Sequence, residues 1–229
     1  MDGARENGGV TRGSEWFVPS FGSTRFRSFV GLLFLPYTGM VLSFLVIGSV
    51  LAPRIHWDRL CALGMIYFLA LGIGAHALDA LGSPGAKPWG EVFSRRRLWA
   101  LAIASLAIAY GLAIYYMVRY VPLLWSMALA EGFFVFAYNL EWFRGRFHSD
   151  NWFAFSWGFL PVLAGYIMQT NRVSVAALTI ACAMALFSGV EIKASRPYKE
   201  LKRLTGSRTE DERLLMMRYE AILKAISLG

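Results

Sequence analysis

Three ionisable residues stand where long apolar segments of the sequence end. His76 and Asp79 lie three residues apart at the end of the second apolar segment, and helical spacing puts them on one face. Glu191 directly follows the last apolar segment, so we expect it at the same depth. Carboxylates and imidazoles are ligands for divalent cations. His76, Asp79 and Glu191 are therefore a candidate metal site.

Further ionisable residues are predicted near this level. Basic side chains could hold a phosphate group, and they are Lys87, Arg95, Arg96, Arg97, Arg196 and Lys199. Glu141, His148 and Asp150, in the loop after the fourth segment, could join the acidic cluster. Each residue alone also has an ordinary interpretation. Glu191 then marks a helix boundary, His76 is a hydrogen-bonded core histidine, and Arg95 to Arg97 set the topology.

Glu131 is the one acidic residue in the middle of an apolar segment. A carboxylate at that depth is costly, so it requires a reason. One interpretation is a hydrogen bond to a neighbouring helix. Another is a role in proton or substrate transport, but the sequence lacks the internal repeat that many transporters carry.

Six apolar runs must position these residues. The chain has 229 residues, of which 56% are hydrophobic and 17% are charged, whereas soluble domains carry about 25% charged residues. A bilayer core needs about 20 residues of helix, and lipid-exposed backbone must satisfy its own hydrogen bonds. We therefore predict an all-α, polytopic transmembrane bundle of about six helices. The runs are Ser28–Ala52, Leu60–Leu78, Leu98–Val118, Tyr120–Leu140, Trp152–Thr170 and Val173–Val190.

The distribution of Lys and Arg predicts the orientation. The N-terminus, the second and fourth connections and the C-terminal tail carry 19 of the 23 basic residues. The positive-inside rule places these segments in the cytoplasm, in a protein of the cell membrane. The net charge of +8 then reflects topology and attraction to anionic lipid, so nucleic-acid binding is not needed to explain it.

The two ends of the chain differ from the apolar centre. Residues 1–24 are largely polar and Gly-rich and are predicted to form a disordered cytoplasmic segment. The transmembrane domain is expected over 25–195 and a basic cytoplasmic tail over 196–229. Thr209 and Glu212 form a capping box that predicts a helix start. Leu215, Tyr219, Ile222 and Ile226 then form an apolar stripe, which could pack on the protein itself or lie in the lipid interface.

The order of these motifs resembles the UbiA superfamily of intramembrane prenyltransferases. The segment GAHALDALGSPGAKPW occupies the position of that family's first Asp-rich motif, and VEIKASRPYK occupies the position of its second. YNLEWFR resembles the family's Tyr-and-basic segment after the fourth helix, and WGFLPVLAGY resembles its fifth helix. Of the expected acids, Asp79 remains in the first motif and Glu191 in the second. The family has about nine helices, whereas this sequence predicts six.

The resemblance implies two functions. In the first, the chain is a divergent prenyltransferase in which Asp79 and Glu191 are catalytic and hold an isoprenoid diphosphate through Mg²⁺ or another divalent cation. Lys87, Arg196, Lys199 and Tyr138 would then bind the diphosphate. In the second, the chain is a non-catalytic membrane subunit that binds lipid or a cofactor together with other membrane subunits. The loss of most of the acids favours the second function, and the retained order of motifs favours the first. The sequence leaves enzymatic activity open.

Overall fold

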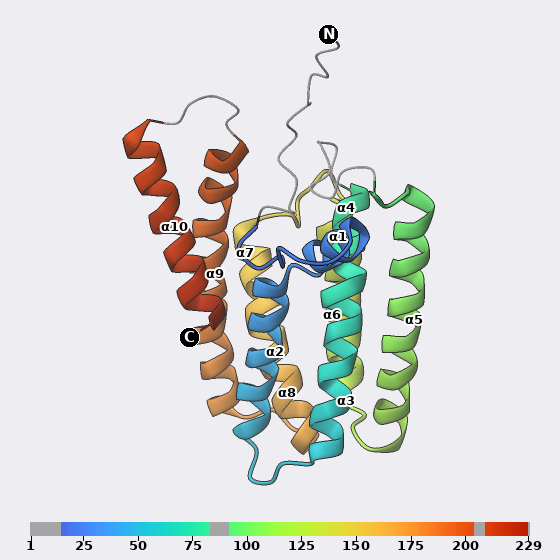
Figure 1. Ribbon diagram of the computed structural model, residues 1–229. Helices are drawn as coiled ribbons and strands as arrows, with labels where there is room; N and C mark the ends of the chain where they lie inside the picture. The colour runs from blue at the N-terminus through green and yellow to red at the C-terminus, as the bar shows by residue number, and fades with distance from the viewer. Residues whose placement is uncertain (1–14, 83–91, 204–208, 229) are drawn as a thin grey trace.

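The computed structural model describes residues 15–82, 92–203 and 209–228, and every regular element in these ranges is a helix. The long helices run up and down beside one another and form a bundle (Figure 1). The elements in chain order are α1 (Thr24–Leu33), α2 (Leu35–Val50), α3 (Trp57–Tyr67), η2 (Phe68–Ala75), α4 (His76–Gly82), α5 (Arg95–Arg119), α6 (Leu124–Asn139), α7 (Asp150–Phe153), η4 (Ala154–Phe159), α8 (Leu160–Thr170), α9 (Val175–Arg203) and α10 (Glu210–Leu228).

Two helical rods, α3–α4 and α7–α8, each contain a π-helical segment. η2 lies between α3 and α4, and η4 lies between α7 and α8. A π-segment adds a residue to a helical turn and shifts the side chains that follow, and such segments are frequent at functional sites. η2 packs beside α6, and η4 packs beside α9. The two segments therefore help to determine which side chains face the interior of the bundle.

Some of the six predicted membrane spans are supported by the structure. Three described helices are long and apolar enough to cross a bilayer, namely Trp57–Gly82, Arg95–Arg119 and Val175–Lys202. The bent pair α1 and α2 makes a fourth if it counts as one span. This is fewer than the six predicted. α2 and α6 have 16 residues each and α8 has 11, below the about 20 residues that a span requires.

The first predicted span is not one continuous helix. Phe34 adopts a left-handed conformation with φ of 41°, and α1 and α2 meet there at an angle of 43°. Pro36 follows in the first turn of α2, where its missing N–H costs nothing. The hydroxyl of Thr38 donates to the carbonyl of Leu33 at 2.7 Å and stabilises the break. The apolar run Ser28–Ala52 therefore contains a bend that its composition does not reveal.

Glycines allow α2 and α8 to approach at backbone distance. A Cβ atom at Gly48 would clash with the carbonyl of Val162, and one at Gly165 would clash with the carbonyl of Leu45. Small residues at helix contacts are typical of membrane bundles, where close packing replaces the hydrophobic driving force. This contact fixes the position of α2, which carries part of the candidate site.

The predicted C-terminal helix is present as α10. The Thr209 backbone N–H donates to Glu212 Oε2 at 2.8 Å, and the Glu212 N–H donates to Thr209 Oγ1 at 3.2 Å. These are the two bonds of a capping box. α10 packs against α9 and α2, and Leu223 is buried with Ala194 and Tyr198 of α9. Of the two interpretations of this helix, packing on the protein itself is the one observed.

The packed face of α10 differs from the predicted stripe. Leu215 and Ile222 are 41% and 40% exposed. The stripe that contacts the bundle is Met216, Tyr219, Leu223 and Ile226. Both stripes have helical spacing, because α10 carries apolar residues on more than one face. The prediction was therefore wrong for half of its members, since periodicity alone does not select the face that meets α9.

The borders of the predicted domains also need correction. α9 runs without interruption from Val175 to Arg203, so the expected border at 195/196 lies inside a helix. Part of the segment expected to be disordered is placed on the bundle. Glu15 pairs with Lys202 at 2.8 Å, and the ring of Phe17 meets that of Phe34 edge-on at 5.2 Å. Residues 1–14 lie outside the described ranges.

Candidate functional site

Aromatic rings from three parts of the chain meet at the end of the bundle where α4 and α6 end. Phe34 lies at the break between α1 and α2, and Tyr37 follows one turn later, with their ring centroids 4.3 Å apart. His76, the first residue of α4, lies 5.9 Å from Phe34 and 5.5 Å from Trp157. Trp157 also lies 6.1 Å from Tyr37. These four rings form a wall behind the polar side chains of α9.

Lys199 reaches this wall from α9. Its ammonium nitrogen lies 4.9 Å from the ring centroid of Phe34 and 5.4 Å from that of Tyr37. A cation over an aromatic face is attracted by the electron density of the ring. The contact holds the long side chain in one place and directs its charge into the bundle.

Glu191 lies on α9 below Lys199 and is fully buried, with 0% exposure. Neither of its carboxylate oxygens has a hydrogen-bond partner among the described residues. Lys199 is the cation that acts on it electrostatically. Burial of a charged or polar group without hydrogen bonds is costly. Glu191 is therefore held in an unfavourable environment by the packing around it. We call Phe34, Tyr37, His76, Trp157, Glu191 and Lys199 the α9 cluster.

A second group of polar side chains surrounds Tyr138 at the end of α6. Arg196 forms an ion pair with Asp150 at 2.9 Å. The hydroxyl of Tyr138 interacts electrostatically with Asp79, Asp150 and Arg196. His148 stacks on the Tyr138 ring at 4.5 Å and contacts its backbone carbonyl through Nδ1 at 3.0 Å. We call Asp79, Tyr138, His148, Asp150 and Arg196 the Tyr138 cluster.

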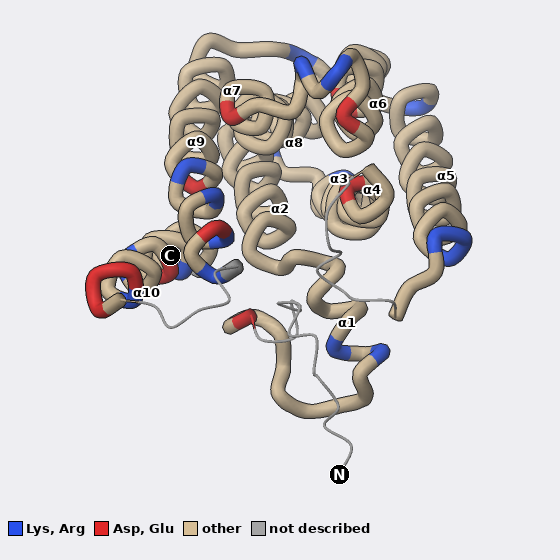
Figure 2. The backbone as a smooth tube through the Cα atoms, turned by 90° about the horizontal axis from the view of Figure 1, so that it is seen from above, with Lys and Arg blue, Asp and Glu red and all other residues tan. Residues whose placement is uncertain are grey.

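The two clusters are neighbours. Arg196 and Lys199 are three residues apart on α9, so they share a helix face. Phe153 of α7 lies between the clusters, 5.3 Å from Tyr37 and 6.1 Å from Tyr138. Figure 2 looks down on this end and shows charged positions on α4, α6, α7 and α9. Most of the residues predicted from the sequence are thus gathered at one end of the bundle.

The predicted metal set does not form a metal site. Within the described part of the chain, no group of three or more His, Cys, Asp or Glu side chains is arranged to hold an ion. His76 is packed between the rings of Phe34 and Trp157, Asp79 belongs to the Tyr138 cluster, and Glu191 belongs to the α9 cluster. Helical spacing placed these residues at one level but did not specify the neighbours of each. Lys87, predicted to bind diphosphate, lies outside the described residues.

Glu131 has a partner that the sequence did not identify. The Tyr67 hydroxyl, from the end of α3, donates to Glu131 Oε1. Tyr110 of α5 donates to the carbonyl of Ala128, one turn earlier on α6, at 3.2 Å. The bond between Tyr67 and Glu131 is the interhelical hydrogen bond that was one of the interpretations predicted for Glu131. Tyr67 carries a hydroxyl group in the middle of an apolar run. That position is the sequence signal that could have identified Tyr67 as the partner of Glu131.

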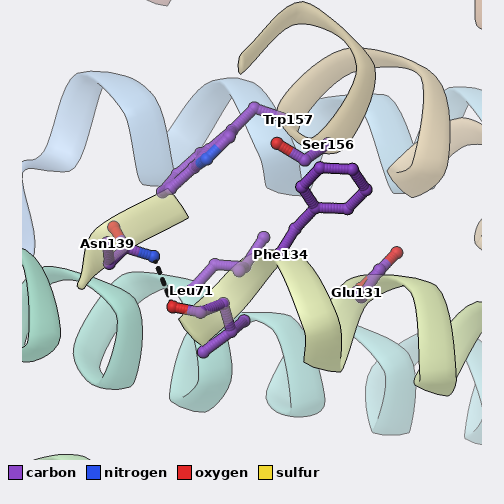
Figure 3. A pocket seen from close by; sticks show the side chains of 7 residues that line it. Leu71, Glu131, Phe134, Asn139, Ser156 and Trp157 are labelled. Carbon is purple, nitrogen blue, oxygen red and sulfur yellow. Dashed lines mark hydrogen bonds between the residues drawn. The ribbon is translucent and has the colours of Figure 1, made fainter. Parts of the chain in front are cut away.

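A small cavity lies beside Glu131. It is lined by Glu131, Phe134, Asn139, Ser156 and Trp157, together with Leu71 and Val135, as Figure 3 shows. The space measures about 10 Å³, which is enough for about one water molecule. The Asn139 side-chain amide donates to the carbonyl of Val135 at 2.8 Å, drawn as a dashed line in Figure 3. The cavity is too small for an isoprenoid chain.

No family model, curated protein or solved structure matches this chain.

Proposed function

We propose that this chain is a six-span membrane protein, similar to the UbiA superfamily, that binds the phosphate head of an isoprenoid-type lipid without catalysing its transfer. Both termini would lie in the cytoplasm. The support for six crossings is the alternation of α2, the α3–α4 rod, α5, α6, the α7–α8 rod and α9 along the bundle. The polar end would then face the cytoplasm, where 19 of 23 basic residues are expected.

The observation that carries this proposal is the contact of Lys199 with an aromatic wall, on the same helix as Arg196 and as the buried Glu191 with which Lys199 interacts electrostatically. Arg196 and Lys199 share one face of α9 and enter neighbouring clusters. Guanidinium and ammonium groups bind phosphate oxygens through charge-assisted hydrogen bonds. Phe34 and Tyr37, whose rings contact Lys199, and Trp157 beside Tyr37 would give the site an apolar lining, and all three side chains are buried.

Binding is favoured over catalysis because the described residues include no cluster of three or more side chains that could hold a metal ion. A leaving diphosphate needs metal ions or several cations to stabilise its developing charge. Among the described residues, no group of three or more His, Cys, Asp or Glu side chains is placed to hold an ion. The alternative, a divergent prenyltransferase, is favoured by one observation. Asp79 and Glu191 remain at the two motif positions, each beside a residue able to contact phosphate, Tyr138 or Lys199.

A binding experiment tests the proposal and separates the two functions. The full chain, purified in mild detergent, is titrated with farnesyl diphosphate and with geranylgeranyl diphosphate, in EDTA and in Mg²⁺. We expect binding in both conditions and no release of diphosphate. Each lost charge-assisted hydrogen bond is worth about 1.5–3 kcal/mol, so Arg196→Gln and Lys199→Gln should each weaken binding about tenfold or more.

Lys193→Gln provides the matched control, because Lys193 is an exposed residue on the same helix. It should bind like the wild type. Binding that requires Mg²⁺ and is followed by diphosphate release would establish the prenyltransferase instead. If the wild type binds neither compound in either condition, both functions are excluded.

A further inference from the structure

The loop that joins α6 to α7 has a strained backbone. Glu141, Phe143 and Arg144 have φ angles of 53°, 56° and 60°, and Gly145 follows with 75°. A residue other than glycine loses about 1–2 kcal/mol in this left-handed conformation. Such strain persists where the surrounding structure imposes it, and it is concentrated at functional sites. The strain therefore indicates that the side chains of this loop are held in their positions for a function.

The strained backbone presents two aromatic and two basic side chains at the surface. Trp142 is 46% exposed and Phe143 is 63% exposed. Arg144 and Arg146 are exposed too, and neither forms an ion pair with a described residue. Figure 2 shows the basic positions of this loop at the edge of the bundle, near α6 and α7. Glu141 is the one acid among the loop residues 140–149, so the loop keeps a net positive charge.

Below the loop, a row of aromatic rings continues along the outside of the bundle. Neighbouring ring centroids in the row are 4.9 Å apart for Phe133 and Phe147, 5.3 Å for Phe147 and Trp152, 6.0 Å for Trp152 and Phe155, and 5.3 Å for Phe155 and Phe159. None of these five side chains is fully buried. We call them the aromatic row. Phe143 of the loop meets its upper end, 5.6 Å from Phe147.

We propose that the loop and the aromatic row form a binding site for one anionic phospholipid. Arg144 and Arg146 hold its phosphate, and one acyl chain lies along the aromatic row. Two arginines offer planar donors that match phosphate oxygens. The loop lies at the polar end of the bundle, where a membrane provides head groups, and Trp side chains are enriched at that depth. A charged head above a continuous apolar row is the pattern of charge that an anionic lipid complements.

This site is separate from the one proposed for the isoprenoid lipid. The α9 cluster is formed by α2, α4, η4 and α9, and its cations are on α9. The aromatic row uses α6, the loop, α7 and the outer face of η4. Trp157 and Phe155 are two residues apart on η4 and belong to the two different sites. The lipid site can therefore exist whether or not the chain binds isoprenoid diphosphates.

Native mass spectrometry tests the proposal with the full chain in mild detergent. Phosphatidylglycerol and phosphatidylcholine are titrated separately, and the retained lipid is counted. We expect the wild type to retain one phosphatidylglycerol and to bind phosphatidylcholine much more weakly. A basic side chain near a charged lipid surface is worth about 1 kcal/mol, and 1.4 kcal/mol is tenfold in affinity. The double variant Arg144→Gln and Arg146→Gln should therefore bind phosphatidylglycerol about 30-fold more weakly.

Two further variants make the test specific. The double variant Arg213→Gln and Arg218→Gln removes two exposed charges on α10, which packs against α9 and α2 and away from the aromatic row, and it should bind like the wild type. Phe155→Ala should weaken binding of both lipids, because it interrupts the surface for the chain. Equal losses for the two arginine pairs, or wild-type affinity after loss of Arg144 and Arg146, would overturn the proposal.

Discussion

Two glutamates inside the bundle, the partly buried Glu131 and the fully buried Glu191, have contrasting environments. Glu131 of α6 accepts a hydrogen bond from Tyr67, which is itself only 3% exposed. Glu191 of α9 is completely buried, and neither of its oxygens has a hydrogen-bond partner among the described residues. A buried polar group that is hydrogen-bonded contributes to stability, whereas one without partners reduces it. The contrast indicates that Glu131 joins two helices, and under the proposed function we infer that Glu191 is retained for ligand binding.

The largest effect on stability should follow replacement of Glu131. Glu131→Leu leaves the Tyr67 hydroxyl buried without an acceptor, and an unsatisfied group of this kind costs about 1–3 kcal/mol. We expect the free energy of unfolding, measured by SDS titration in detergent micelles, to fall by about 2 kcal/mol. An unchanged or higher stability would mean that the pair does not support the bundle.

The same substitution at Glu191 should increase the stability of the protein, not decrease it. Glu191→Leu removes a buried polar group that lacks partners and replaces it with an apolar side chain of similar size. We expect the free energy of unfolding to rise by about 1–2 kcal/mol in the same titration. Binding of farnesyl diphosphate should not weaken, because the substitution removes a carboxyl group that interacts with Lys199 and could compete with the phosphate. A loss of stability here would remove the distinction between the two glutamates.

A double-mutant cycle isolates the bond between α3 and α6. Tyr67→Phe removes the hydroxyl, and the cycle with Glu131→Gln measures the coupling between the two side chains. Interhelical hydrogen bonds in membranes are worth about 0.6 kcal/mol on average and up to about 1.7 kcal/mol. We expect a coupling near 1 kcal/mol. For comparison, Tyr110→Phe should show a smaller coupling to Glu131, because the Tyr110 hydroxyl donates to the carbonyl of Ala128 and interacts with Glu131 only electrostatically.

The smallest effect is expected for the ion pair of the Tyr138 cluster. The side chains of Arg196 and Asp150 are 44% and 32% exposed, and ion pairs of this kind contribute about 0–1 kcal/mol. Asp150→Asn should therefore change stability by less than about 1 kcal/mol and should strengthen phosphate binding, because Arg196 is released. A large loss of stability would show that this cluster, like the Glu131 pair, has a structural role.

Local features of the candidate site were predictable, and contacts between distant segments were not. Asp79, Tyr138, Glu191, Arg196 and Lys199 were placed at one end of the bundle because the lengths of apolar runs set the depth of each residue. Their division into two clusters depends on how the helices are rotated, which no run length specifies. The aromatic wall was also missed, although Phe34 and Tyr37 are three residues apart and so share a face.

The sequence by itself determined the helical class, the presence of apolar segments long enough to cross a membrane, and the start of α10. The first two follow from the number and length of apolar runs, and the third from a capping box, whose bonds join residues three positions apart. Tertiary structure alone decided the break at Phe34, the face by which α10 packs, and which glutamate has a partner. The physical reason is that each of these depends on contacts between helices that are distant in the chain. Tyr67 and Glu131, for example, are 64 residues apart.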